Sequence, residues 1–398
     1  MNVRLHSLPF LLAALLTMAV AVACVEPIVD EGASRELTVR VVVPTADLVT
    51  KADVAAVGNE DKMYDIRIWA FDHAETGDDA KAVGYGSATI EAGATSQNVT
   101  VTFPNSVNGK LDNEPSVSVD LYVVANGASV GFTQADLENV NVTRKYLEEF
   151  VLNDAKGAAG FGTACVSQVP DTGLPMSAVK DNVDITFLKN GGTHDSVEIK
   201  LKRAVAKIRF VFAKAANMTD ATEIKSIELI NRTTEYTIGW EQMLSQFSYL
   251  FPRETPKLSA ATLKWPANST QGPLVPNTSF VGKTVDTPLR LRNDYQNKEI
   301  AAYEAFLDAE IEAGHAIEKI LYLRECDPYK TRVTALINYT IGTATERTVE
   351  IEIPSGALLN RNTWWTIYAY FMSFDLGFEV TVHEDWDVYN GGAISVSG

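Results

Sequence analysis

The sequence has very few cysteines and few basic residues. Only Cys24, Cys165 and Cys326 occur in 398 residues, so the chain lacks the cysteine framework of a small disulfide-bonded domain. Cys165 and Cys326 could pair in an oxidising compartment or stay separate buried thiols. Against 51 Asp and Glu stand 34 Lys and Arg, which gives a formal net charge of −17. So acidic a chain is not expected to bind nucleic acid, which requires a basic surface.

Catalytic and metal-binding motifs are also missing from the sequence. None of the five histidines stands at the spacing of metal ligands, and there is no G-x-S-x-G, Walker loop or G-x-G-x-x-G. We therefore expect neither enzymatic activity nor a cofactor. Trp364 and Trp365 could stack on a sugar, but strand alternation puts them on opposite faces and favours a core position for at least one.

The chain begins with features of an export leader. Arg4 precedes an apolar run from Leu8 to Ala23, which is short and terminal, as in a secretory signal rather than a membrane span. Small residues directly before Cys24 resemble a bacterial lipoprotein signal, in which this cysteine is lipidated after cleavage. An ordinary secreted protein cut near Ala23 is the alternative. No other apolar run approaches the length of a membrane span.

A strand and a loop follow the leader. In Glu36–Pro44 the apolar residues recur with a period of two, which predicts a strand with one buried face. The residues of that face are Leu37, Val39, Val41 and Val43. The loop Thr45–Ala52 contains one basic residue, Lys51. If this strand were lost, we expect apolar side chains and unpaired backbone groups to be exposed at a sheet edge, where another strand could add.

Short alternating segments dominate the remainder of the chain. We expect strands at Tyr64–Phe71, Val99–Phe103, Val117–Val123, Val183–Phe187, Val197–Phe212, Ile224–Ile230, Val333–Ile341, Val349–Ile353, Trp364–Phe371 and Phe378–Val382. Helices are expected after Thr133, which can cap one, and at Gln296–Ala313. Many strands with little helix predict an all-β protein of two β-sandwich domains. A glycine pair within Lys189–Thr193 marks the boundary between them.

Several segments resemble the fimbrillin family of Bacteroidetes, the subunits of type V pili. Their order and spacing carry the resemblance more than any single segment does. The segments are Leu121–Asn126 (LYVVAN), Gly173–Ser177 (GLPMS), Leu201–Phe210 (LKRAVAKIRF), Tyr322–Glu325 (YLRE), Arg361–Trp364 (RNTW) and the near-terminal Trp386.

The resemblance implies two transthyretin-like β-sandwich domains in tandem, with minor helices. It also implies export as a lipoprotein to the outer membrane and cleavage by a trypsin-like protease after the first strand. The subunits would then assemble into a fimbria by donor-strand exchange and support adhesion. Expected partners are other fimbrial subunits, the protease, the outer membrane through the lipid, and surface ligands of host or bacterial cells. The expected divisions are signal 1–23, propeptide 24–51, and domains 52–190 and 191–398.

Cleavage is expected between Lys51 and Ala52. Arg35 precedes the strand and Arg40 lies within it, whereas Lys51 lies in the loop. Family members commonly have arginine at this position, so lysine leaves the protease undetermined; the alternative is an ordinary solvated loop lysine. Candidate donor residues lie on both sides of the glycine pair Gly391-Gly392, which can form a hinge. They are Trp386, Val388, Ile394 and Val396.

Two classes of function remain open from the sequence. The first is the fimbrial subunit described above. The second is a surface lipoprotein that does not polymerise, either a fimbrial anchor or a glycan-binding β-sandwich. A glycan-binding protein should keep Glu36–Pro44 and expose an aromatic platform. A polymerising subunit should lose this segment and take up a strand from a neighbour.

Overall fold

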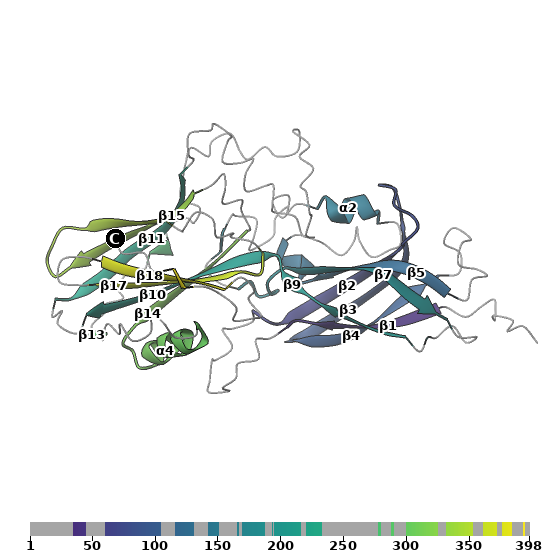
Figure 1. The fold of residues 1–398 in the computed structure, drawn as a ribbon, viewed down its shortest axis with the longest axis horizontal. Coiled ribbons are helices and arrows are strands. Elements are labelled where there is room, and N and C mark those ends of the chain that lie inside the picture. The colour runs from purple at the N-terminus through teal and green to yellow at the C-terminus, as the bar shows by residue number, and fades with distance from the viewer. Residues whose placement is uncertain are drawn as a thin grey trace, which may run out of the picture.

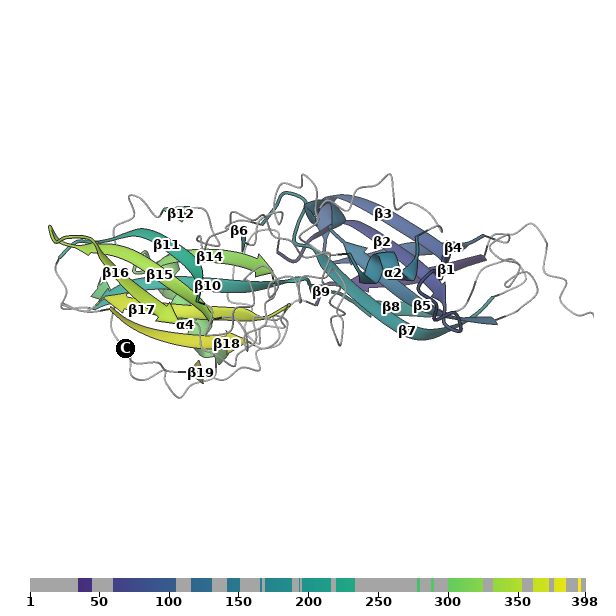
Figure 2. The same ribbon diagram turned by 90° about the horizontal axis from the view of Figure 1, so that it is seen from above.

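The fold of the chain is all-β in the computed structural model. The structure describes residues 35–44, 60–104, 116–130, 142–150, 165–166, 169–187, 193, 195–215, 220–232, 278–279, 288–289, 300–324, 332–352, 361–371, 376–383 and 393–394. These residues form three sheets with a few short helices. Two groups of strands lie end to end in an elongated arrangement (Figures 1 and 2). No helix of the described ranges has the length and apolar character needed to cross a membrane.

The first group is one eight-stranded sheet, ordered β8-β1-β4-β3-β2-β5-β7-β9. Its strands are β1 (Arg35–Val42), β2 (Met63–Asp72), β3 (Ala82–Ala94), β4 (Ser96–Phe103), β5 (Ser116–Ala125), β7 (Met176–Thr186), β8 (Ser196–Lys200) and β9 (Lys202–Arg203). A 3-10 turn η1 (Gly127–Val130) and a short helix α2 (Arg144–Glu148) accompany it. The core contains the fully buried Trp69, Phe71 and Phe103.

Within this sheet, β3 and β4 are paired only where Tyr85 meets Thr102, although the strands are consecutive. Two glycines of β3 allow a close approach. A Cβ on Gly84 would lie 2.8 Å from the ring of Phe103, and a Cβ on Gly86 would lie 2.3 Å from the carbonyl oxygen of Thr100. Side chains at these positions would therefore displace β4 from β3.

The second group consists of two sheets. The seven-stranded sheet contains β6 (Cys165–Val166), β10 (Val205–Ala215), β13 (Pro288–Leu289), β14 (Ile317–Arg324), β17 (Trp364–Phe371), β18 (Leu376–His383) and β19 (Ala393–Ile394). The four-stranded sheet contains β11 (Thr222–Arg232), β12 (Thr278–Ser279), β15 (Arg332–Ile341) and β16 (Arg347–Glu352). Tyr339 of β15 lies 5.0 Å from Phe371 of β17 between ring centroids, so the two sheets pack face to face.

The helix α4 (Ile300–Glu312) packs against β10 and β17 of the seven-stranded sheet. Leu307 of the helix lies in one buried cluster with Val211, Ala213 and Tyr368. The alternate residues of β10, such as Phe210 and Phe212, are also fully buried. The central strand β10 is therefore buried on both faces, and its three charged residues, Lys207, Arg209 and Lys214, are buried as well.

Most strand predictions are confirmed, and so is the helix at 296–313, which is α4. Three details differ. The segment expected as one strand, Val197–Phe212, is divided into β8, β9 and β10. Strands β3 and β14 were not predicted. The helix α2 begins at Arg144 with Thr143 as its cap, since the Thr143 hydroxyl accepts from the Tyr146 N–H; the expected cap Thr133 lies outside the described residues.

The division of the chain into domains stays a prediction. The strands β8 and β9 follow the expected boundary at residue 190, yet they pair with β1 and β7 in the first sheet. The chain enters the second group at Val205, the first residue of β10. The segment from β8 to β10 therefore joins the two groups of strands as one nearly continuous stretch.

Candidate functional site

The first candidate site is the position of β1 in its sheet. Exposure alternates along the strand, and the four residues expected to be buried are 0–2% exposed: Leu37, Val39, Val41 and Val43. Glu36, Thr38 and Arg40 are exposed on the other face. Burying four such side chains contributes roughly 6–12 kcal/mol in gross terms, at about 1.5–3 kcal/mol each.

The strand β1 is not at the sheet edge, contrary to the expectation from sequence. It pairs antiparallel with β4 over eight residue pairs and parallel with β8 over five. Val39, for example, stands between Val99 of β4 and Val197 of β8. We call this position between β4 and β8 the β1 slot. Departure of β1 would free backbone groups on two facing strands, so the slot could bind a strand from both sides.

Two arginines of β1 are held in different ways. Arg35 is 3% exposed and its guanidinium lies 5.2 Å from the centroid of the Phe187 ring. Arg40 has an exposed side chain, which lies 3.7 Å from a Glu198 carboxylate oxygen, but its backbone lies between Asn98 and Glu198 in the sheet.

The lipidation residue Cys24 and the cleavage residues Lys51 and Ala52 lie outside the described residues.

One of the four donor candidates lies within the described residues. Ile394 belongs to β19 and stands opposite Val380 of β18, so part of the tail pairs with its own second group of strands. Trp386, Val388 and Val396 lie outside the described residues, as does Cys326. Cys165 belongs to β6, opposite Leu323 of β14.

Two of the family-like segments meet at Asn126. This residue ends the LYVVAN strand in a left-handed conformation, with φ of 58°. Its side-chain nitrogen donates to the carbonyl oxygens of Leu174 and Lys62 at 2.8 and 2.9 Å, and its side-chain oxygen accepts from the Tyr64 N–H. A Cβ on Gly173 would lie 2.3 Å from that side-chain nitrogen. The glycine of the GLPMS turn is therefore needed for Asn126 to reach the turn.

Two further family-like segments meet at Arg203 and Asn362. Asn362 is also left-handed, with φ of 60°. Its side-chain oxygen accepts from the backbone N–H and the guanidinium Nη1 of Arg203, at 3.3 and 3.0 Å. The same guanidinium donates to the Glu60 carbonyl oxygen at 3.4 Å and to the Asp61 carboxylate at 2.5 Å. Arg203 is 1% exposed and so is a buried tie between segments far apart in sequence.

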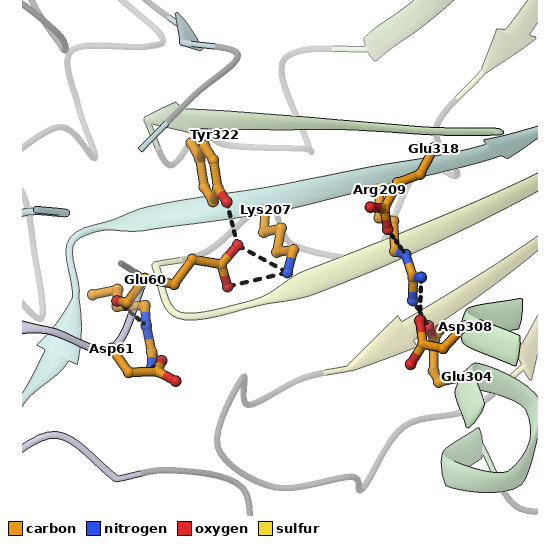
Figure 3. Close-up of polar contacts among 9 residues, drawn as sticks. Glu60, Asp61, Lys207, Arg209, Glu304, Asp308, Glu318 and Tyr322 are labelled. Carbon is orange, nitrogen blue, oxygen red and sulfur yellow. Dashed lines mark hydrogen bonds and ion pairs between the residues drawn. The ribbon is translucent and has the colours of Figure 1, made fainter. Parts of the chain in front are cut away.

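A buried acid lies beside this tie (Figure 3). The Glu60 carboxylate accepts from Lys207 Nζ, with both oxygens at 3.1 Å, and from the Tyr322 hydroxyl. Lys207 Nζ also lies 4.1 Å from the centroid of the Trp364 ring. Burial and the neighbouring Glu60 raise the pKa of Tyr322, so the hydroxyl stays protonated and donates. We call Glu60, Asp61, Arg203, Lys207, Tyr322 and Asn362 the junction cluster, because they join the two groups of strands.

A second buried arginine holds α4. Arg209 of β10 contacts Glu304 and Asp308 of the helix and Glu318 of β14, with 2.7 Å to Glu304 and 2.5 Å to Glu318. Burial, together with the neighbouring Glu304 and Glu318, raises the pKa of Asp308 although Arg209 lowers it. Figure 3 shows Arg209 on the same strand as Lys207, and its carboxylate partners separate from Glu60. The arrangement fixes α4 to its sheet, and all three carboxylates are bonded to Arg209.

A third polar cluster lies in the first sheet. Asp120 of β5 accepts from His73 Nδ1 at 2.7 Å, from Arg144 Nη1 at 2.8 Å and from the Asn182 N–H at 2.9 Å. Burial disfavours the charged carboxylate, but the hydrogen bonds from Asn182, His73 and Arg144 outweigh it, and the pKa of Asp120 falls below its usual range. This cluster anchors α2, which begins at Arg144.

We expect the stabilisation from Asp120 to be lost in acid. Because its folded pKa lies below the unfolded value of about 3.9, the contribution is fully present above that value and disappears as the pH falls through the folded pKa. Replacement D120N should lower the free energy of unfolding by about 1.5–3 kcal/mol at neutral pH, the range for hydrogen bonds to charged groups. The deficit should shrink at acid pH in urea titrations of both proteins. A deficit independent of pH would contradict this account.

Neither tryptophan of the Trp364-Trp365 pair forms an exposed platform, since they are 7% and 0% exposed. Within the described ranges, no group of three or more His, Cys, Asp or Glu side chains could hold a metal ion. Among the residues whose side-chain exposure the structure describes, the most exposed large apolar side chain is Tyr146 of α2, at 44%. The described surface therefore gives no specific support for a sugar site.

Comparison with protein-family models and with curated proteins gives no match. Similar solved structures include a candidate cell adhesion protein from Parabacteroides distasonis, with a TM-score of 0.49, 14% identity, and coverage of 88% of this chain and 96% of that one. The tip fimbrial protein Mfa3 from Porphyromonas gingivalis has a TM-score of 0.39 and 13% identity, and the match covers 87% of this chain and 99% of that one. The fimbrial anchor protein Mfa2 from the same organism has a TM-score of 0.36 and 10% identity, and the match covers 92% of this chain and 100% of that one.

Proposed function

We propose that this chain is a structural subunit of a cell-surface fimbria that assembles by exchange of its first strand. The precursor is exported as a lipoprotein through Cys24 and is cut between Lys51 and Ala52. Removal of β1 then opens the β1 slot, and a strand from another subunit fills it. The fimbria supports adhesion at the outer membrane surface.

The observation that carries this proposal is the position of β1 between β4 and β8. Eight pairs on one side and five on the other mean that a replacement strand gains backbone hydrogen bonds along both edges. The four inward side chains are each at most 2% exposed, so the replacement strand also buries apolar area. Part of this gain offsets the ordering of the incoming segment, and the remainder favours an exchange that is slow to reverse.

The surroundings of the basic residues support the choice of Lys51. A protease needs an accessible, extended segment of backbone around its cleavage site. Arg35 is buried against Phe187, and the backbone at Arg40 is enclosed by pairing on both sides. Cutting at either position would also leave part or all of the strand attached to the rest of the chain.

The proposal is tested on the full-length precursor with a trypsin-like protease. We expect the mature chain to begin at Ala52 and to form a ladder of oligomers that resist SDS, whereas a K51A variant stays uncut and monomeric. Edman or mass-spectrometric sequencing identifies the new N-terminus. A cut chain that stays monomeric would contradict polymerisation, and a surface-extracted chain still beginning at Cys24 would leave the anchor-type role instead.

A further inference from the structure

We propose that Arg203 and Asn362 are positioning residues that hold β8 as one wall of the β1 slot after β1 has left. This inference rests on the proposed function, because it concerns the chain in which the first strand has been removed. It assigns to the junction cluster a part in strand uptake, beyond joining the two groups of strands.

The strand β8 needs such support because it lies at the end of the sheet. In the sheet order, β1 is the neighbour of β8. Departure of β1 would remove the five residue pairs between these strands and the bond from the Leu201 N–H to the Val42 carbonyl oxygen. Two ties to β7 would remain at and before β8: Lys180 Nζ donates to the Glu198 carbonyl oxygen at 3.1 Å, and the Thr186 N–H donates to the Asp195 carboxylate at 2.8 Å. Without the backbone pairing to β1, the C-terminal end of this edge strand would otherwise be prone to local opening.

The chain directly after β8 is fixed by contacts that do not involve β1. Arg203 pairs with Met176 of β7, and the Ala204 N–H donates to the Pro175 carbonyl oxygen at 2.8 Å. The Arg203 guanidinium reaches Asn362, Asp61 and the Glu60 carbonyl oxygen. All of these groups remain when residues up to Lys51 are removed. The chain just after β8, a few residues beyond Ile199, therefore stays attached to β7 when β1 leaves.

The Arg203 guanidinium also holds residues that follow the expected cleavage site in the sequence. Glu60 and Asp61 stand just before β2, a short distance after Ala52. Arg203 therefore links three parts of the cut chain: the wall β8, the start of β2, and Asn362 beside β17. Because Arg203 is 1% exposed, its side chain has little freedom to leave this geometry. The slot is held in the shape that a strand needs, which lowers the ordering cost of binding.

The test measures whether the opened slot takes back the strand it lost. In the full-length protein, a recognition site for a specific endoprotease is placed in the loop 45–52, and the chain is cut. The N-terminal fragment is separated from the cut protein in mild urea, and the urea is then removed. The cut protein is titrated into a trace of fluorescent peptide with the sequence of residues 35–44, and the affinity is measured by anisotropy. The variants are R203Q and N362G, each compared in its folded state. Glycine suits the left-handed conformation of Asn362, so N362G removes the acceptor with little backbone strain.

The matched control is R144Q, which also removes a partly buried arginine–aspartate pair but lies in α2, away from β8. We expect R203Q and N362G to weaken peptide binding by about tenfold or more, and R144Q by less than about threefold, since only the first two release the wall. Equal affinities for all four proteins would overturn the inference. Failure of the unsubstituted cut protein to bind the peptide would also overturn it, because the wall would not have persisted.

A parallel measurement separates this inference from the proposed function. A peptide with the sequence of residues 386–398 replaces the β1 peptide in the same assay. If the β1 peptide binds in an Arg203-dependent way and no sister-subunit tail peptide competes with it, the positioning role stands and strand exchange between subunits fails. If tail peptides bind equally well to R203Q and to the unsubstituted protein, the positioning role fails while the proposed function stands.

Discussion

Replacing Glu60 with alanine is expected to lower the free energy of unfolding by about 3–5 kcal/mol, the cost of breaking a buried ion pair from one side. Glu60 is 5% exposed and Lys207 is 1% exposed. The variant leaves the Lys207 ammonium buried without its carboxylate, and the Tyr322 hydroxyl loses the acceptor that faces it.

The penalty from E60A should be partly recovered in the double variant E60L/K207M, in which the Tyr322 hydroxyl still lacks the Glu60 acceptor. Replacing both members of a buried pair by apolar groups of similar size removes two desolvation costs together. The double-mutant cycle built from E60L, K207M and E60L/K207M should therefore show strong coupling between the two positions. Urea unfolding followed by tryptophan fluorescence measures these three variants, E60A and the unsubstituted protein. A loss of under about 1 kcal/mol for E60A would show that the pair is solvated and does not hold the junction.

The first strand was predictable because its signal is local. The alternation of Leu37, Val39, Val41 and Val43 is a property of consecutive residues, and the structure confirms it. Its neighbours were not predictable in this way, because pairing with β8 brings together residues far apart in the sequence. The sequence therefore indicated a strand with one buried face but placed it at an edge instead of between two strands.

The strand β3 shows the opposite case. Gly84 and Gly86 interrupt the apolar alternation from which a strand is recognised. The structure gives their reason, since β4 lies so close to β3 that a Cβ at either position would clash. The feature that concealed the strand in the sequence is thus required by its packing. No rule based on local periodicity could have distinguished this from a loop.

The junction cluster was only half visible in the sequence. The segments around Arg203, Tyr322 and Asn362 were identified by resemblance, but Glu60 carries no local signal. It is an acidic residue in an acidic chain, and its partners Lys207 and Tyr322 stand 147 and 262 positions away. Such a role is defined only by tertiary contact. The left-handed asparagines Asn126 and Asn362 are similar, since each is explained by the segment that it contacts.

Placing a carboxylate in the β1 slot should have the largest effect on the first strand. Val39 is fully buried between Val99 and Val197. The replacement V39D would therefore bury either an unpaired carboxylate or a protonated carboxyl group that lacks a hydrogen-bond partner. We expect a loss of roughly 4 kcal/mol or more. The matched control is T38D, because Thr38 is exposed on the opposite face of the same strand. That variant should change stability by no more than about 0.5 kcal/mol.

If β1 is a separable strand, V39D should release it while the remaining sheet stays folded. Arg40 would then become accessible to trypsin, since its backbone is protected only by pairing with Asn98 and Glu198. Mass spectrometry of limited digests should show cleavage after Arg40 in V39D but not in T38D, and digestion of both in urea verifies that the site remains cleavable. Loss of the tryptophan signal of Trp69 together with β1 would mean that the strand and the core unfold as one unit. In that event the first strand could not be exchanged without unfolding the sheet that receives its replacement.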